Sequence, residues 1–416
     1  MSVHEAAART APTRGGRITL ALAVGTTIAG GIPVFLLGAL FTQIQRETAA
    51  PAWVLGAAVA AYWAAAAVVS MLSGRVISLI GVRAANFLTL AVAAVSLLGS
   101  AVLVPEWSFL LVWAVVGGAA NGLGHPSSNS LIHARVSPTK LATAFGIKQS
   151  AVPFSAFIAG LTVPAIGLTV GWPWAFAAAS VLTVVLIVLL KVYGPPKAKR
   201  GTVKRPPHVR LSGSLVRYLL LVASVTTLGA GAAGAVSSYA VTAAVGRGVD
   251  DAWAGVLLSI GSLVGATSRI VSGRLADRTL GRYALVTASG MLAIGGLGVL
   301  LMSLDVEWTF ILGLILALGI GWGWPGLTHF VVSHVAGPAT PSATGIVQTG
   351  SYIGSGGGPL VFGLFFSFMG DGSLWLFVGA VQLVAACIAF WLSRRTPPAT
   401  PVSPDAAAVP AVPASR

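Results

Sequence analysis

Apolar stretches of about 20 residues recur along the whole chain, separated by short segments that hold charged residues, proline and glycine. A helix of that length crosses roughly 30 Å of hydrocarbon, so each stretch is expected to span a membrane. The pattern predicts an all-α polytopic membrane protein with twelve transmembrane helices at about 18–41, 52–72, 84–104, 109–133, 141–168, 173–193, 217–245, 252–272, 284–304, 309–335, 343–369 and 373–393.

The composition agrees with this pattern. Of the 416 residues, 56% are hydrophobic and 8% are charged, whereas soluble domains carry about 25% charged residues. One cysteine excludes a disulfide framework and every cysteine-based zinc or iron-sulfur site, which need several thiolates. We expect no cofactor and no metal.

The basic residues gather in alternate loops, and most acids lie in the opposite loops. Cytoplasmic loops are rich in lysine and arginine, so both termini are predicted to be cytoplasmic (N-in, C-in) in a multi-pass protein of the plasma (inner) membrane. The net charge of +15 is explained by this topology, so no nucleic-acid partner is expected. The predicted partners are the lipid bilayer, a small substrate and protons, and the protein is expected to be a monomer.

The two halves of the chain resemble each other at an offset of about 200 residues. Matching segments occur in nearly every predicted helix: Arg17 with Arg217, Ala52 and Trp53 with Ala252 and Trp253, Gly146 and Gln149 with Gly345 and Gln348, and Trp174 with Trp375. Six is an even number, so the halves have the same orientation. We predict a cytoplasmic tail at 1–16, six-helix bundles at 17–193 and 217–393, a cytoplasmic linker at 194–216 and a disordered cytoplasmic tail at 394–416.

The segment from Ser272 to Arg278, followed by Gly281 and Arg282, resembles the loop signature of the major facilitator superfamily (MFS). Two parallel six-helix repeats are the architecture of that superfamily. The resemblance implies that Asp277, with Arg278, helps to lock a cytoplasmic gate. The first copy of the loop has Ser78 in place of the acid. The alternative is that Asp277 is a solvated loop carboxylate.

Charged side chains inside the predicted helices are cationic only. All ten acids lie outside the twelve predicted spans, whereas Lys148, Arg269, His125 and His329 lie within them. An ionisable group in the hydrocarbon is a functional-site hypothesis, and fixed positive charge attracts anions. The alternatives are that either cation reaches toward the membrane surface and that either histidine bonds a neighbouring helix.

Arg269 lies four residues before Gly273. An arginine at this place resembles the substrate-binding arginine of the monocarboxylate and oxalate transporter branches. A guanidinium offers a planar fork for a carboxylate. This sequence departs from those branches, because Val347 rather than a lysine aligns with Lys148. A nitrate transporter is a weaker match.

The fourth predicted helix carries three polar residues on one face, namely Asn121, His125 and Ser128. Trp322 and His329 hold the corresponding places in the tenth helix. Gln348 and Tyr352 of the eleventh helix complete the candidate substrate-binding set. Histidine is the usual proton carrier near neutral pH, so His125 and His329 are the candidates for proton coupling.

The sequence therefore predicts a secondary transporter that moves a small organic anion, in particular a monocarboxylate, by alternating access with proton symport. The alternative is a proton-coupled exporter of drugs or metabolites in the same superfamily. An enzyme is not expected, because the spans contain no acid/base pair and no metal cluster.

Overall fold

The computed structural model describes residues 14–136, 141–194, 211–279, 281 and 283–398, apart from a few side chains within these ranges. Its first group of helices comprises α2 (Arg14–Thr48), α3 (Trp53–Ile80), α4 (Val82–Val102), α5 (Ser108–Arg135), α6 (Leu141–Gln149), α7 (Ala151–Thr162), the π-helix η2 (Val163–Gly167) and α8 (Trp172–Tyr193). The second group comprises α9 (Gly213–Gly246), α10 (Asp251–Arg278), α11 (Ala284–Met302), α12 (Glu307–Leu318), the 3₁₀ turn η3 (Ile320–Trp322), α13 (Pro325–Ala336), the 3₁₀ turn η4 (Gly337–Ala339), α14 (Thr340–Met369) and α15 (Asp371–Ser393).

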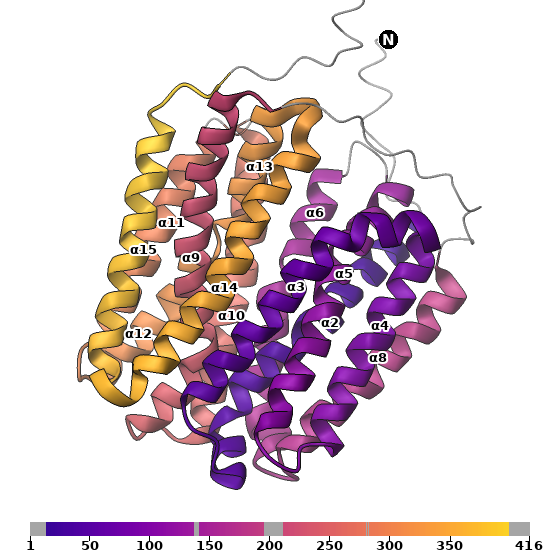
Figure 1. Cartoon of the computed structure of the whole chain (residues 1–416). Coiled ribbons are helices and arrows are strands. Elements are labelled where there is room, and N and C mark those ends of the chain that lie inside the picture. The colour runs from indigo at the N-terminus through magenta and orange to yellow at the C-terminus, as the bar shows by residue number, and fades with distance from the viewer. Residues whose placement is uncertain (1–13, 137–140, 195–210, 280, 282, 399–416) are drawn as a thin grey trace, which may run out of the picture.

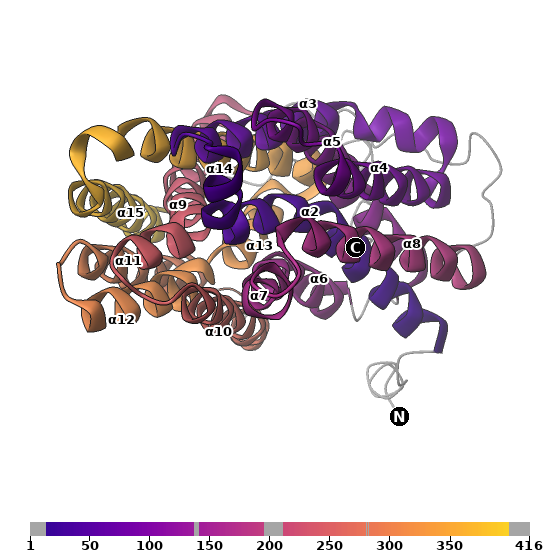
Figure 2. The same ribbon diagram turned by 90° about the horizontal axis from the view of Figure 1, so that it is seen from below.

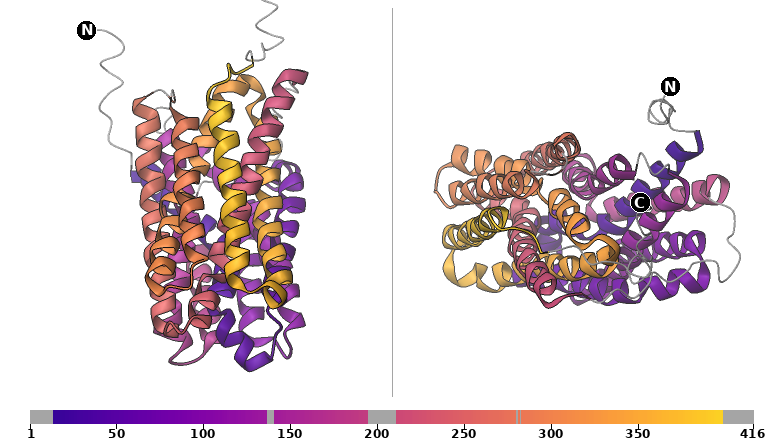
Figure 3. Two further views of the ribbon diagram at one scale, coloured as in Figure 1. Left: turned by 90° about the vertical axis from the view of Figure 1, so that its left-hand side faces the viewer. Right: turned by 90° about the horizontal axis from the view of Figure 1, so that it is seen from above.

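The helices run roughly along one common direction, as the side view in Figure 3 shows. Within the described residues, eleven segments are long and apolar enough to cross a membrane. The predicted span at 343–369 corresponds to α14, which is rich in glycine and is not among the eleven. The chain is thus an all-helical polytopic protein, while the count of twelve spans stays a prediction.

Two predicted spans are broken into two helices each. The span at 141–168 is interrupted at Ser150, between α6 and α7, three residues before Pro153. The span at 309–335 is interrupted between Gly319 and Trp324, just before Pro325 begins α13. Proline has no amide hydrogen and glycine lowers helix stability, so both breaks follow from the local sequence.

The turns at equivalent places in the two groups each contain a glycine with a positive φ. Gly81, between α3 and α4, has φ of +84°, and Gly281, between α10 and α11, has φ of +71°. Glycine adopts this left-handed conformation without the penalty that a side chain brings. The correspondence matches the offset of the sequence repeat.

The two groups meet mainly where α2 packs against α9, α3 against α14, and α7 against α10. Viewed along the helices, α14 lies beside α3 and α10 beside α7 (Figure 2). The crossing of α7 and α10 is close, because a Cβ added to Gly160 would lie 2.5 Å from the carbonyl oxygen of Gly255. Small residues of this kind let helix backbones approach within a membrane.

The groups are held together at the end of the molecule opposite to the start of α2. There Arg46 of α2 pairs with Asp251 of α10, and the Thr42 hydroxyl lies 3.4 Å from that of Thr242. Toward the other end, the ribbons of the two groups diverge (Figure 1).

Candidate functional site

Lys148 and Arg269 are buried on opposite sides of the boundary between the two groups. Lys148 lies in the last turn of α6 and exposes 1% of its surface, and Arg269 lies in α10 and exposes 7%. α10 packs against both α6 and α7. The two cations that the sequence singled out therefore lie at the same boundary, where Arg269 bonds the backbone of Gln149, the residue after Lys148.

Lys148 is held by neutral groups of α5. Its ammonium nitrogen donates to Asn129 Oδ1 at 2.7 Å and to the carbonyl oxygen of His125 at 3.3 Å, and it lies 3.1 Å from His125 Nδ1. These contacts take up the three ammonium donors. They satisfy the hydrogen-bonding capacity of Lys148 without neutralising its charge.

Arg269 donates to two backbone carbonyls. Each lies at a break in a helix, where regular helical hydrogen bonding is interrupted. Its Nη1 donates to Gln149 O at 2.9 Å across the boundary, and its Nε donates to Trp322 O at 3.0 Å. In a regular helix the amide of residue 153 would bond the carbonyl of Gln149, but Pro153 has no amide hydrogen. Trp322 closes η3, outside the hydrogen-bond ladder of α13. The bent helices thus create the acceptors that fix the guanidinium.

The indole of Trp322 completes the surroundings of Arg269. The guanidinium carbon lies 5.3 Å from the centre of the Trp322 ring. That ring meets the ring of Phe35 from α2 edge to face, with 6.0 Å between centroids. A cation over an aromatic face is attracted to it, so Trp322 binds Arg269 through its ring and its carbonyl. Trp322 therefore also limits how far the guanidinium can move.

No carboxylate compensates these cations among the described side chains. The one ion pair within 4.0 Å in that part of the chain joins Arg46 and Asp251, at the far end of the bundle. Buried charges normally pair with a counter-ion because desolvation is costly. An anion that entered between Lys148 and Arg269 would supply the missing charge.

The two histidines lie in the same region. His125 interacts electrostatically with Lys148, Arg269 and His329, although His329 belongs to the second group of helices. His329 Nδ1 lies 2.8 Å from the carbonyl oxygen of Pro325, and its Nε2 lies 3.2 Å from Gln348 Oε1. The candidates from α5, α13 and α14 therefore border the region of the two cations.

Asn121 and Tyr352 are buried. The Asn121 side-chain oxygen and the Tyr352 hydroxyl make no hydrogen bond within 3.5 Å to a described residue, although Ser70 and Gln348 lie near that hydroxyl. The ring of Tyr352 packs against that of Trp63 of α3 at an interplanar angle of 31°, with 5.7 Å between ring centroids. Most buried polar atoms in proteins are hydrogen-bonded, so unpaired ones indicate a place for water or a polar ligand.

Sequence reasoning missed three contributors to this region. Asn129 repeats the four-residue spacing of Asn121 and His125 and therefore shares their helical face, a signal that was present in the pattern. Ser128, which was assigned to that face, instead lies 3.3 Å from the Thr27 hydroxyl on α2. The carbonyl of Gln149 and the ring of Trp63 carry no such signal.

The predicted gate residues lie at the end of α10. Arg278 is its last residue and is exposed. The side chain of Asp277 lies outside the described part of the structure. The gate role of both residues stays a prediction.

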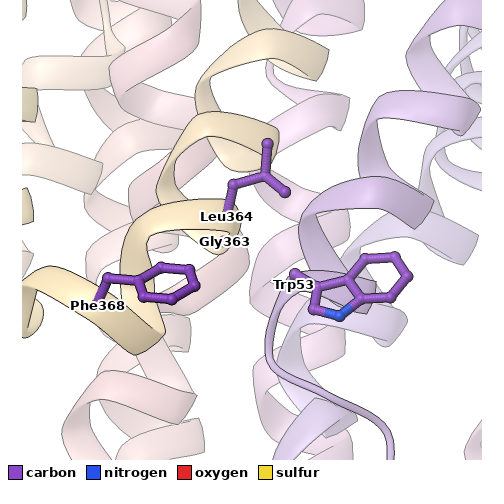
Figure 4. Close-up of a pocket in the computed structure, with 4 residues that line it drawn as sticks. All are labelled: Trp53, Gly363, Leu364 and Phe368. Carbon is purple, nitrogen blue, oxygen red and sulfur yellow. The ribbon is translucent and has the colours of Figure 1, made fainter.

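A surface groove lies between the start of α3 and the end of α14 (Figure 4). Trp53 lines it from α3, and Gly363, Leu364 and Phe368 line it from α14. Gly363 follows Tyr352 by eleven residues, about 17 Å along the helix. Apart from the indole nitrogen of Trp53 the lining is apolar, so it offers no group for binding an anion.

Comparison with known proteins matches residues 18–340 to the model of the family described as Major Facilitator Superfamily. No curated protein matches the chain.

Proposed function

We propose that this chain, which belongs to the Major Facilitator Superfamily and is a polytopic membrane transporter, moves a small organic anion together with a proton. The observation that carries the proposal is the pair of buried cations, Lys148 and Arg269, at the boundary between the groups. Neither forms an ion pair with a carboxylate among the described side chains. A transported anion is the counter-charge that this region needs.

A carboxylate is the anion that fits these groups best. The guanidinium of Arg269 already uses Nε and Nη1 on carbonyls, and its remaining nitrogen can donate to a carboxylate oxygen. The ammonium of Lys148 can exchange one neutral partner for the second oxygen. Trp322, Phe35 and Trp63 supply apolar surface for the body of the anion. These features support a monocarboxylate.

Proton symport is the coupling that the charges favour. One proton moving with a monoanion transfers no net charge, so the step needs no buried acid. His125 and His329 are the candidate carriers, because histidine changes its charge near neutral pH. Asn121, Gln348 and Tyr352 are proposed to contact the substrate.

In this proposal the protein lies in the plasma membrane with twelve spans and both termini in the cytoplasm. Transport proceeds by rocking of the two groups around Lys148 and Arg269. The contacts of Arg46 with Asp251 and of Thr42 with Thr242 support a conformation that is closed at the end opposite to the termini.

The deciding experiment is transport into liposomes that contain the purified protein, with an imposed pH gradient. The probes are radiolabelled L-lactate, oxalate and benzoate, with nitrate and tetraphenylphosphonium as comparisons. We expect accumulation of at least one carboxylate when the outside is acidic. Export of tetraphenylphosphonium without carboxylate uptake would favour the exporter instead and contradict the proposal.

Substitution of the two cations tests their role directly. Lys148→Ala and Arg269→Ala are each expected to lower uptake by about 10- to 100-fold, since hydrogen bonds to charged groups contribute about 1.5–3 kcal/mol. Lys191→Ala and Arg217→Ala remove exposed cations and serve as matched controls that keep normal uptake. Unchanged uptake in both site variants excludes the binding role.

A further inference from the structure

The two histidines of the site have opposite hydrogen-bonding requirements. His329 Nδ1 faces the carbonyl oxygen of Pro325 at 2.8 Å. A carbonyl oxygen accepts and never donates, so Nδ1 of His329 must carry a hydrogen. Its other ring nitrogen, Nε2, faces the side-chain amide of Gln348 at 3.2 Å. The protonation of His329 is therefore decided at Nε2.

Gln348 can serve either form of that nitrogen. A primary amide presents an oxygen on one side and an NH₂ group on the other, and it exchanges them by rotating half a turn. With the oxygen toward Nε2, the amide accepts a hydrogen bond from the imidazolium. With the NH₂ group toward it, the amide donates to the neutral ring. His329 can therefore gain or lose a proton and keep both hydrogen bonds.

His125 has no such freedom. Its Nδ1 lies 3.1 Å from the ammonium nitrogen of Lys148. An ammonium group only donates, so Nδ1 must present its lone pair. A proton added there would place two donors and two positive charges against each other away from water, where their repulsion is strong. The charged Lys148 thus keeps His125 neutral.

We propose that His329 carries the coupled proton, with Gln348 as its positioning residue, whereas His125 stays neutral and holds Lys148. This assignment rests on the proposed symport of an anion and a proton. It separates two histidines that sequence reasoning treated as equivalent, and it gives Gln348 a role in proton binding rather than in substrate contact alone.

The charges around His329 explain how the proton and the anion are coupled. α13 packs against α9, α10, α11 and α14, and α11 has no ionisable side chain. Arg269 is a buried cation on α10, and Lys148 and His125 lie across the boundary. His125 interacts electrostatically with Lys148, Arg269 and His329, so the four groups share one region. The other described ionisable side chains on these helices are Arg217, Tyr218 and Tyr239 of α9, Asp251, Arg274 and Arg278 of α10, Tyr352 of α14, and His334 of α13 itself.

An imidazolium at His329 is repelled by Arg269 and Lys148 while the site is empty. A bound carboxylate supplies one negative charge and weakens that repulsion, so the anion favours proton binding at His329. By linkage, protonated His329 favours the anion to the same extent. The two solutes are therefore expected to bind together.

Nuclear magnetic resonance of the full-length protein with ¹⁵N-labelled histidine tests the assignment with and without a carboxylate probe. His125→Asn and His329→Gln identify the two ring signals. Over a titration from about pH 8 to pH 5, we expect His329 to keep the hydrogen on Nδ1 and, with a carboxylate probe present, to gain one on Nε2. His125 is expected to remain the neutral tautomer with its hydrogen on Nε2. Titration of His125 beside intact Lys148, or a neutral His329 throughout, overturns the proposal.

Transport measurements then separate this proposal from the proposed function. With the three carboxylate probes and a pH-sensitive dye inside the liposomes, His329→Gln should lose acid-driven accumulation and keep carboxylate exchange. His125→Asn should raise KM and keep proton movement. Gln348→Leu should change the pH profile of uptake, whereas a merely structural role would lower uptake equally at every pH. The reverse pattern for the two histidines contradicts the proposal. Carboxylate uptake that moves no proton in the wild type contradicts it too, while anion transport itself would still stand.

Discussion

The guanidinium of Arg269 donates a 2.9 Å hydrogen bond to the backbone carbonyl of Gln149, so the second group of helices bonds the first at the level of the buried cations. Pro153 makes that carbonyl available, because it lies four residues after Gln149 and has no amide hydrogen to offer it. A break in one helix thereby orients a side chain of another.

Pro153→Ala restores an amide that competes with Arg269 for the carbonyl of Gln149. We expect KM for the transported carboxylate to rise about 3- to 10-fold with little change in maximal rate, because a hydrogen bond to a charged group is weakened rather than lost. Pro164→Ala changes a proline of the adjoining η2 turn and serves as the control. Equal kinetics in both variants contradict the role assigned to Pro153.

Asn129→Asp places a carboxylate where a neutral oxygen now accepts from Lys148 at 2.7 Å. The new carboxylate would pair with the ammonium of Lys148 and neutralise the positive charge that the substrate is expected to neutralise. Uptake should fall by more than about tenfold while the thermal unfolding temperature is kept or raised. Asn129→Ala, which adds no negative charge, should retain most of the uptake. Full activity of Asn129→Asp would show that the charge of Lys148 is not used.

The ion pair of Arg46 and Asp251 is expected to bias the molecule toward closure at the end opposite to the termini. Arg46 is 57% exposed, and such pairs contribute about 0.2–1 kcal/mol. Asp251→Asn should therefore raise opening of that end by roughly 1.4- to fivefold.

The measurement uses Thr242→Cys in a Cys387→Ser background, labelled by an impermeant maleimide from the side opposite to the termini. The exchange of Arg46→Asp with Asp251→Arg should return labelling to the original rate. If labelling is insensitive to both changes, the pair does not act on closure.

Sequence reasoning located the helices and several site residues for local reasons. Apolar length and the positions of charged residues mark spans, and a buried Lys148 or Arg269 is visible as soon as the span is recognised. Gly81 and Gly281 are separated by 200 residues, the offset of the repeat, and both take the positive φ that a tight turn requires. The helix breaks near Pro153 and Pro325 also follow from the local sequence, because proline has no amide hydrogen.

The partners of those residues were decided by the tertiary structure. The pairing of Arg269 with Gln149, of His329 with Gln348, and of Arg46 with Asp251 joins positions far apart in the chain. Such pairs depend on how helices pack and rotate against one another, which the hydrophobic pattern of each helix leaves open. The sequence by itself determined that positive charge is buried in this membrane protein. Only the packed helices decided which carbonyls and amides surround that charge, because those partners come from other helices, and it is on these partners that the proposed proton carrier rests.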